Sequence, residues 1–215
     1  MEKIDHIRKW LGSGSINIFG LQFSGKDTVG KQLANLLGAQ FISSGDVMRD
    51  IFLHKDATTD PKIWQAAQSS SLTGFLMPTD EFQLMIASTL SNPALDGKPL
   101  ILSTVGRWIG EEQPVLELLR SSDHETKAVL LLTISEAEAW RRWQEVRDAR
   151  DGGRHDDVDE EKVARRFAEY YDKTIPVIDV YRGMNILLEV NAEQKRETVL
   201  SDVIDVLYEF SRRRD

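Results

Sequence analysis

Lys26 follows a glycine-bounded loop of the kind that proteins use to hold phosphate groups. The loop has the spacing GxxxxGK and reads GLQFSGK from Gly20 to Lys26. Gly20 and Gly25 allow a tight turn and a close approach of backbone N–H groups to phosphate oxygens, and Lys26 adds a full positive charge. Ser24 lies in the same loop, and the hydroxyl of Thr28 either binds a phosphate or caps the following helix. We therefore expect Gly20, Ser24, Gly25, Lys26, Asp27 and Thr28 to surround a bound phosphate chain.

Asp27 departs from the usual form of this loop, in which Ser or Thr follows the lysine. In other phosphate-binding loops that hydroxyl faces a metal ion. Two interpretations of Asp27 stay open. Its carboxylate could hold Mg²⁺, which binds carboxylates together with phosphate oxygens and water. It could also be an acid in a first helical turn, where the helix dipole contributes only ~0.3–1 kcal/mol.

The elements around the loop alternate between strand and helix. An apolar run at residues 16–19 predicts a buried strand before the loop, and apolar residues at helical spacing follow it. Further strands are predicted at 39–43, 98–103, 128–133 and 185–190, with helical patterns between them. This alternation is typical of an α/β domain with a doubly wound, five-stranded parallel sheet. Ligands of such sheets bind at the carboxyl ends of the strands, where the loop lies.

Several helix boundaries follow from local signals. Asp60 and Pro61 predict a helix start, and the helix predicted at 159–173 is expected to stop before Pro176. Asn191 is expected to cap the last helix.

Composition limits the classes of function. The chain has 215 residues, which favours one domain, and a formal net charge of −8, which argues against binding to nucleic acid or to an anionic membrane. It has no cysteine, which excludes disulfides and thiolate-bound metals. Residues 1–14 predict an amphipathic helix that packs on the flank of the domain and lacks the apolar core of a signal peptide. We therefore expect a cytoplasmic, monomeric protein.

Further motifs follow the loop in a recognisable order. They read ISSGDVMR at 42–49, GFLMPTD at 74–80, GR at 106–107 and GRHDD at 153–157, and RFAEYY at 166–171 and TIPVI at 174–178 come after them. Together with the loop, these motifs resemble those of the adenylate kinase family of nucleoside monophosphate kinases. The resemblance covers nearly the whole chain from Ile16.

The resemblance implies a P-loop kinase domain over 15–215 that binds two nucleotides. Its core would comprise 15–43, 92–146 and 158–215, with a helical insert at 44–91 over the nucleoside monophosphate and a short lid at 147–157. ATP would be the phosphoryl donor, Mg²⁺ the metal and AMP the default acceptor, with GMP and deoxynucleoside monophosphates as alternatives. The catalysed reaction would be ATP + NMP ⇌ ADP + NDP.

The resemblance also assigns roles to individual residues. The acceptor would be bound by Ser44, Gly45, Arg49, Leu76, Met77, Gly106 and Arg107. The phosphoryl group in transfer would be held by Lys26, Arg107, Arg154, Arg166 and Arg147. Arg165 is a rival to Arg166, because the spacing from Arg154 is one residue longer than the family's, and Arg150 is a rival to Arg147.

The chain departs from the family pattern at positions that bear on function. The family has an acid at the end of the third strand that helps to hold Mg²⁺, and this chain has Ser103 there. Glu111 occupies the position of the family's base-reading glutamine, and Gln113 follows two residues later. Either side chain could read the acceptor base. Phe23 stands where the family prefers glycine.

These departures keep two other functions open. One is a nucleotide-binding module that has lost catalysis and acts as a sensor. The other is a kinase of the same fold with a different small-molecule acceptor.

Overall fold

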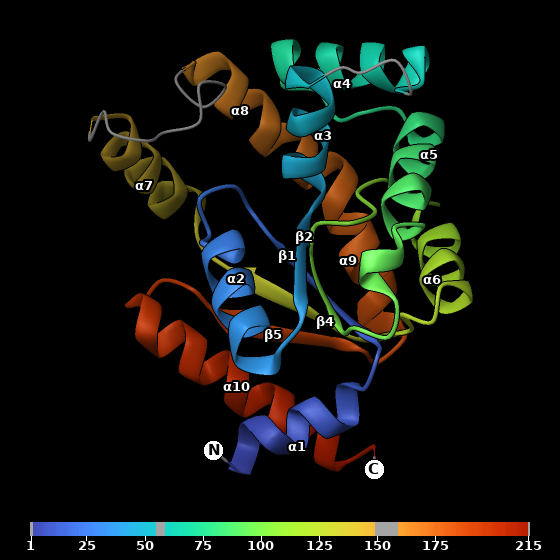
Figure 1. The fold of residues 1–215 in the computed structure, drawn as a ribbon. Helices are drawn as coiled ribbons and strands as arrows, with labels where there is room; N and C mark the ends of the chain where they lie inside the picture. The colour runs from blue at the N-terminus through green and yellow to red at the C-terminus, as the bar shows by residue number, and fades with distance from the viewer. Residues whose placement is uncertain (1, 55–58, 149–158, 215) are drawn as a thin grey trace.

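The computed structural model describes residues 2–54, 59–148 and 159–214, and its centre is a five-stranded sheet (Figure 1). The strands are β1 (Ser15–Gly20), β2 (Gln40–Ser43), β3 (Leu100–Ser103), β4 (Thr126–Thr133) and β5 (Leu187–Asn191). Their order across the sheet is β2-β3-β1-β4-β5, and every neighbouring pair is parallel. This arrangement confirms the predicted α/β class with a parallel sheet.

Helices connect the strands along the described residues. They are α1 (Glu2–Leu11), α2 (Lys26–Leu37), α3 (Ser44–Leu53), α4 (Pro61–Thr73), α5 (Thr79–Leu90), α6 (Glu112–Ser121), α7 (Glu136–Asp148), α8 (Glu160–Glu169), α9 (Ile175–Gly183) and α10 (Arg196–Arg212). A short 3₁₀ turn, η1 (Pro93–Leu95), precedes β3. In Figure 1, α3 to α5 rise above the sheet beside β2, and α7 and α8 rise above it on the other side.

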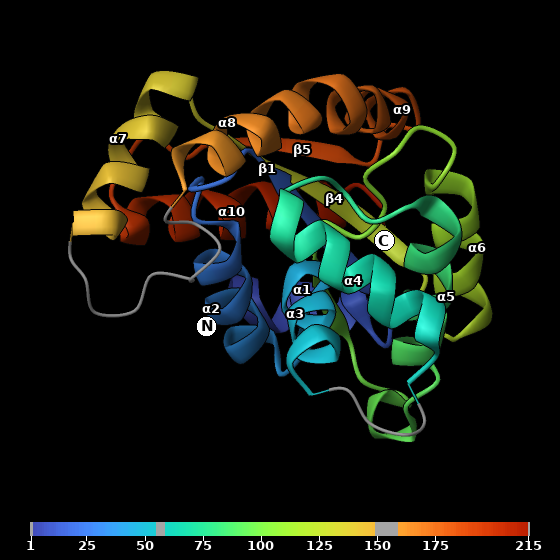
Figure 2. The same ribbon diagram turned by 90° about the horizontal axis from the view of Figure 1, so that it is seen from above.

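Three apolar clusters hold the layers together. The first packs α1, α2 and α10 against the sheet and includes Ile7, Leu33 and Leu207. The second is formed by residues of α3 to α6 and neighbouring strands, and the third by residues of α7 to α9 with β1 and β4. Figure 2 shows these helices from above. Every residue of β1 is buried, as expected for a central parallel strand that is covered on both faces.

The register of β1 and β3 determines what lies beside the phosphate-binding loop. Ile18 pairs with Ser103, so β3 ends one strand away from the start of the loop at Gly20. Because the strands are parallel, the ends of β1, β2, β3 and β4 meet at one edge of the sheet. Residues far apart in the sequence are therefore neighbours at this edge.

The amphipathic pattern at the N-terminus forms α1, and the predicted packing on the flank is confirmed. Ile7 and Leu11 are almost completely buried against α2 and α10. Within the described residues, no helix combines the length and the apolar character needed to cross a membrane.

Two predicted helix boundaries were wrong. Pro176 does not stop a helix: α8 passes into a π-helix, η3 (Tyr170–Thr174), and then directly into α9, whose first turn contains Pro176. Pro176 comes directly after the wider π-helical turn, in which the N–H of Ile175 donates to the carbonyl of Tyr170, and a first helical turn is where proline is tolerated. Asn191 does not cap α10, which begins after Lys195; its Oδ1 instead accepts the N–H of Glu193 in the preceding turn.

The division into core, insert and lid stays a prediction. The predicted insert corresponds to α3, α4 and α5. Most of the predicted lid, including Arg150 and Arg154, lies outside the described residues.

Candidate active site

The phosphate-binding loop connects β1 to α2 through unusual backbone conformations. Gly25 caps α2 with a positive φ of 87°. A Cβ on Gly20 would lie 2.8 Å from the backbone oxygen of Leu132 and 2.6 Å from Ser24 Oγ, so this position requires glycine. Phe23 has a φ of 65°, a left-handed conformation that glycine adopts without strain. Phe23 therefore adopts the left-handed backbone conformation that suits the glycine found at this position in the family.

Two hydroxyl groups of this segment differ in their surroundings. Ser24 is buried, and its Oγ has no hydrogen-bond partner among the described residues. Thr28 is exposed on α2 and does not cap it, because the cap residue is Gly25. The capping interpretation of Thr28 was therefore wrong, and its role toward a phosphate stays a prediction.

The loop opens onto a cavity that gathers cationic side chains from distant parts of the chain. Lys26 comes from α2, Arg49 from α3, Arg107 from the segment after β3 and Arg166 from α8. The predicted site residues Gly20, Asp27, Gly45 and Leu76 also line this cavity. Four cations around one cavity favour a ligand with several negative charges, such as phosphate groups.

Arg107 lies in the wall of this cavity and is held by two oxygen acceptors. Its Nη2 donates to Ser44 Oγ at 2.7 Å, and its Nε donates to the carbonyl of Thr104 at 3.4 Å. Burial, and then the charge of Arg166, lowers the pKa of Arg107 to about 10. The side chain is still charged at neutral pH, and a bound phosphate would offset the cost of holding this charge away from water.

The backbone that carries Arg107 is held from below by Asn17 of β1. Asn17 Nδ2 donates to the carbonyl of Val105 at 2.7 Å, and its Oδ1 accepts the N–H of Val105 at 3.2 Å. Thr104 and Gly106 on either side have positive φ values of 55° and 80°. Asn17 was missed in the sequence because it stands inside an otherwise apolar strand; a buried amide there is the signal that could have identified it.

The structure distinguishes the rival arginines of α8. Arg166 lines the cavity, whereas Arg165 donates to the carbonyl of Thr73 and stacks over the ring of Phe75 with its guanidinium carbon 4.9 Å from the centroid. Of the two, Arg166 is the one that lies in the wall of the cavity. Arg147 is exposed on α7, with its guanidinium carbon 4.7 Å from the centroid of the Trp143 ring, and is not in the wall of the cavity.

A second, narrow cavity adjoins the first, since Met48, Leu76 and Arg107 line both. Its other walls are Ser44, Met77, Phe82, Met85, Trp108 and Glu111. These mostly apolar side chains and one carboxylate suit a flat heteroaromatic ring.

Glu111 and Gln113 are placed differently relative to this second cavity. Glu111 is buried in its wall, and its Oε2 accepts the N–H groups of Arg107 at 2.6 Å and Trp108 at 3.1 Å. Gln113 is exposed on α6 and lines neither cavity. The alternative that a shifted glutamine reads the base has no support in this arrangement.

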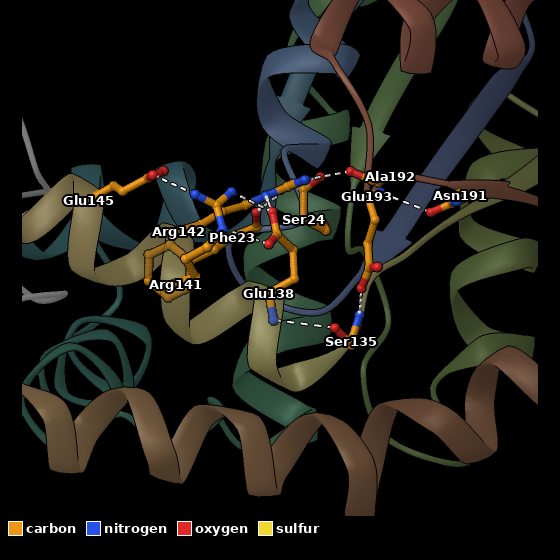
Figure 3. A network of polar contacts seen from close by, with 10 residues as sticks. All are labelled: Phe23, Ser24, Ser135, Glu138, Arg141, Arg142, Glu145, Asn191, Ala192 and Glu193. Carbon is orange, nitrogen blue, oxygen red and sulfur yellow. Dashed lines mark hydrogen bonds and ion pairs between the residues drawn. The ribbon is translucent and has the colours of Figure 1, made fainter.

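Arg142 of α7 ties the phosphate-binding loop to the turn after β5 (Figure 3). Its Nη1 donates to the carbonyls of Phe23 at 3.3 Å and Ser24 at 3.4 Å, and its Nη2 donates to the carbonyl of Ala192 at 2.6 Å. Its Nε donates to Glu138 Oε1 at 2.7 Å. Sequence analysis did not identify Arg142, because the only local signal is a Glu–Arg pair at helical spacing.

Comparisons with known proteins show what this chain is similar to. The family described as an AAA domain matches residues 19–164, more than half of the chain. The adenylate kinase of Thermosipho melanesiensis is 24% identical over 90% of this chain and 99% of its own length. That of Bacteroides thetaiotaomicron is 25% identical over 90% of this chain and 97% of its own length. The adenylate kinase of Clavibacter michiganensis is 32% identical over 81% of this chain and 82% of its own length.

The chain belongs to the adenylate kinase family. As a member of this family it is a P-loop kinase, and the resemblance seen in its motifs is confirmed.

Two departures from the adenylate kinase pattern are in direct contact. Ser103, at the end of β3, donates its hydroxyl hydrogen to Asp27 Oδ1 at 2.6 Å, across 76 positions of sequence. A carboxylate that follows the loop lysine and a serine that replaces the family's acid thus form one hydrogen-bonded pair in the wall of the larger cavity.

Proposed function

We propose that the protein transfers the γ-phosphoryl group of ATP to a nucleoside monophosphate and releases ADP and a nucleoside diphosphate. The observation that carries this proposal is the arrangement of the two cavities. The larger one lies beside the phosphate-binding loop and is lined by four cations, Lys26, Arg49, Arg107 and Arg166. The second, mostly apolar cavity adjoins it. The names of the relatives support AMP as the acceptor. In keeping with the expectation from the sequence, we propose a monomer that acts in the cytoplasm.

Each cation has a role in this reaction. The loop N–H groups and Lys26 would bind the donor phosphates, and Arg49 and Arg107 would hold the acceptor phosphate. An acceptor phosphate oxygen attacks the γ-phosphorus while the bond to the bridging oxygen of ADP breaks, and Arg166 would stabilise the charge that spreads over the group in transfer. Arg154 and Arg147 are predicted to add further positive charge from the lid.

A bound Mg²⁺ would neutralise part of the charge of the phosphate groups. The residues of the cavity fit such an ion, because the carboxylate of Asp27 and the hydroxyl of Ser103 are hard oxygen donors in its wall.

A coupled assay of ADP release tests the proposed reaction. We expect Mg²⁺-dependent turnover with one or more members of a panel of all ribo- and deoxynucleoside monophosphates, and none with ATP alone. Binding of a dinucleotide that spans both sites, without turnover of any panel member, would support a sensor module instead. ATP consumption only with a non-nucleotide acceptor would support a different small-molecule kinase.

Arg107→Lys is the variant that probes the acceptor site in the same assay. We expect kcat/KM for the acceptor to fall about 100-fold, because lysine cannot bind phosphate oxygens with a two-pronged fork. The KM for ATP should change little. If kcat/KM for the acceptor is unchanged in Arg107→Lys, Arg107 does not bind the acceptor phosphate as proposed.

A further inference from the structure

Asp27 is the one acidic side chain among the described residues that line the larger cavity. The other charged residues there are Lys26, Arg49, Arg107 and Arg166, which is the arrangement expected around phosphate groups. A carboxylate beside phosphates repels them, unless a cation lies between the two. The position of Asp27 is therefore unfavourable for nucleotide binding by the protein alone and favourable for binding of a nucleotide with its metal ion.

The carboxylate of Asp27 is held in a defined orientation. Its Oδ1 accepts a 2.6 Å hydrogen bond from Ser103 Oγ, and Ser103 is nearly completely buried at the end of β3. The backbone of Asp27 is fixed as well, because it lies in the first turn of α2 directly after Lys26. A side chain that only compensated the helix dipole would not need a partner on a neighbouring strand.

The oxygen donors at this edge of the sheet match what Mg²⁺ requires of a nucleotide-binding protein. Mg²⁺ commonly takes one or two carboxylates together with phosphate oxygens and several waters. The described part of the chain holds no group of three or more His, Cys, Asp or Glu side chains that could bind a metal alone. Ser24, three residues before Asp27, has a buried Oγ without a hydrogen-bond partner among the described residues, which independently indicates a ligand in the loop.

We propose that Asp27 anchors the Mg²⁺ ion of bound ATP and that Ser103 is the positioning residue that orients its carboxylate. The metal-anchoring acid has thus moved from the end of β3 to the first turn of α2, and a hydroxyl has taken the former position. This inference rests on the proposed use of ATP, but it does not depend on which acceptor is phosphorylated.

Calorimetric titration with a non-hydrolysable ATP analogue, in Mg²⁺ and in EDTA, tests the proposal without any need for turnover. For the unaltered chain we expect the ATP analogue to bind at least tenfold more tightly in Mg²⁺ than in EDTA; the Mg²⁺ ratio is the Kd in EDTA divided by the Kd in Mg²⁺. In Asp27→Asn the Mg²⁺ ratio should approach one. Asp27→Asn should also bind the analogue in EDTA more tightly than the unaltered chain does, because a negative charge near the phosphates has been removed. If Asp27 only stabilised the fold, its substitution would change neither the Mg²⁺ ratio nor the affinity for the analogue in EDTA in this way.

Two further variants sharpen the result. Glu197→Gln removes an exposed acid from the first turn of α10 and should leave the ratio unchanged, which controls for a general helix-dipole effect. The exchange Asp27→Ser with Ser103→Asp returns the acid to β3, and we expect it to recover most of the Mg²⁺ effect that Asp27→Asn loses.

The outcomes separate this proposal from the proposed function. An Asp27→Asn variant with the Mg²⁺ ratio of the unaltered chain overturns the metal anchor, whatever the acceptor assay shows. If the ratio is lost in Asp27→Asn but no nucleoside monophosphate is phosphorylated by the unaltered chain, the anchor stands and the proposed kinase reaction fails. Should Asp27→Asn not fold, the exchange variant alone decides, since a Mg²⁺ ratio near one in that folded protein contradicts the proposal.

Discussion

Glu111 holds the backbone beside the second cavity, and we propose that it also recognises the acceptor base. Its Oε2 fastens the backbone of Arg107 and Trp108, so it contributes to the position of the arginine in the wall between the two cavities. Its Oε1 is buried and has no partner among the described residues. A buried acceptor without a donor is unfavourable, so a ligand that brings an N–H group to this cavity would be selected.

The substitution Glu111→Gln should change base preference. The amide oxygen would keep accepting the backbone N–H groups, and its NH₂ group would then offer a donor where the carboxylate offers an acceptor. We expect kcat/KM for AMP to rise about tenfold relative to that for GMP, because adenine N1 accepts a hydrogen bond while guanine N1 donates one. The measurement is the ratio of the two constants in the coupled assay.

Glu112→Gln is the matched control for this prediction. Glu112 is also buried, and its Oε2 accepts the N–H of Gly110, but it does not line the second cavity. Its substitution should leave the AMP to GMP ratio unchanged. A ratio that moves equally in both variants would assign the effect to loop stability and not to base recognition.

At the scale of elements, α7 acts as a brace for the phosphate-binding loop. Arg142 projects from α7 to the carbonyls of Phe23 and Ser24, and Glu138 holds it in place one turn earlier (Figure 3). Arg141 donates to both oxygens of the same carboxylate, from Nε to Oε2 and from Nη2 to Oε1, each at 2.7 Å. The loop conformation therefore depends on a helix more than 100 residues later in the sequence.

Loss of this brace should weaken ATP binding more than it slows the chemical step. We expect Arg142→Ala to raise the KM for ATP about tenfold with a smaller change in kcat, because the loop that binds the donor phosphates loses two of its hydrogen bonds. Arg141→Ala is the control, since Arg141 also donates hydrogen bonds to Glu138 but, among the described residues, makes none to the phosphate-binding loop. Equal effects of the two substitutions would argue against the brace.

The same network predicts a dependence of stability on pH. Hydrogen bonds from Arg141, and then from Arg142, lower the pKa of Glu138 from 4.5 to about 2. The ionised Glu138 therefore contributes fully to the free energy of unfolding above about pH 4.5, and this contribution is lost as the pH falls toward 2. In urea unfolding, Glu138→Gln should be less stable than the unaltered chain near neutral pH, and the difference should shrink at about pH 3. A difference that is constant with pH would contradict this assignment.

At the scale of the whole molecule, the first apolar cluster is separate from the two cavities, because none of its residues lines either of them. The first apolar cluster lies on the face of the sheet that α1, α2 and α10 cover, and α1 crosses α10 at the end of the molecule away from α3 to α5 (Figure 1). The two cavities lie at the opposite edge, where the strands end. A substitution in α1 can therefore change stability without changing the site.

Ile7→Ala tests this separation. Ile7 is fully buried among α2 and α10, so its truncation should lower the free energy of unfolding by about 2–5 kcal/mol. The kinetic constants at 25 °C should stay the same while the protein is folded. Lys9→Ala, at an exposed position of the same helix, is the control and should leave both quantities nearly unchanged. An altered kcat in Ile7→Ala would show that α1 communicates with the site.

Local patterns in the sequence determined the phosphate-binding loop, the alternation of strands and helices and the amphipathic α1. They could do so because glycine spacing and hydrophobic periodicity act over a few neighbouring residues. The same local reasoning gave two wrong helix boundaries. Pro176 lies in the first turn of α9 instead of ending a helix, and α10 begins after Lys195 instead of at Asn191. At both places the packing of neighbouring elements decides where the helix begins or ends.

Only the tertiary structure decided which side chains meet. Arg165 and Arg166 are adjacent in sequence, yet on a helix they point about 100° apart, and only Arg166 faces the cavity. Asp27 and Ser103 are both visible as departures in the sequence, but their hydrogen bond depends on the order of β1 and β3 in the sheet. Arg142 has no sequence motif at all, because its partners are backbone carbonyls whose positions arise only when α7 packs beside the loop.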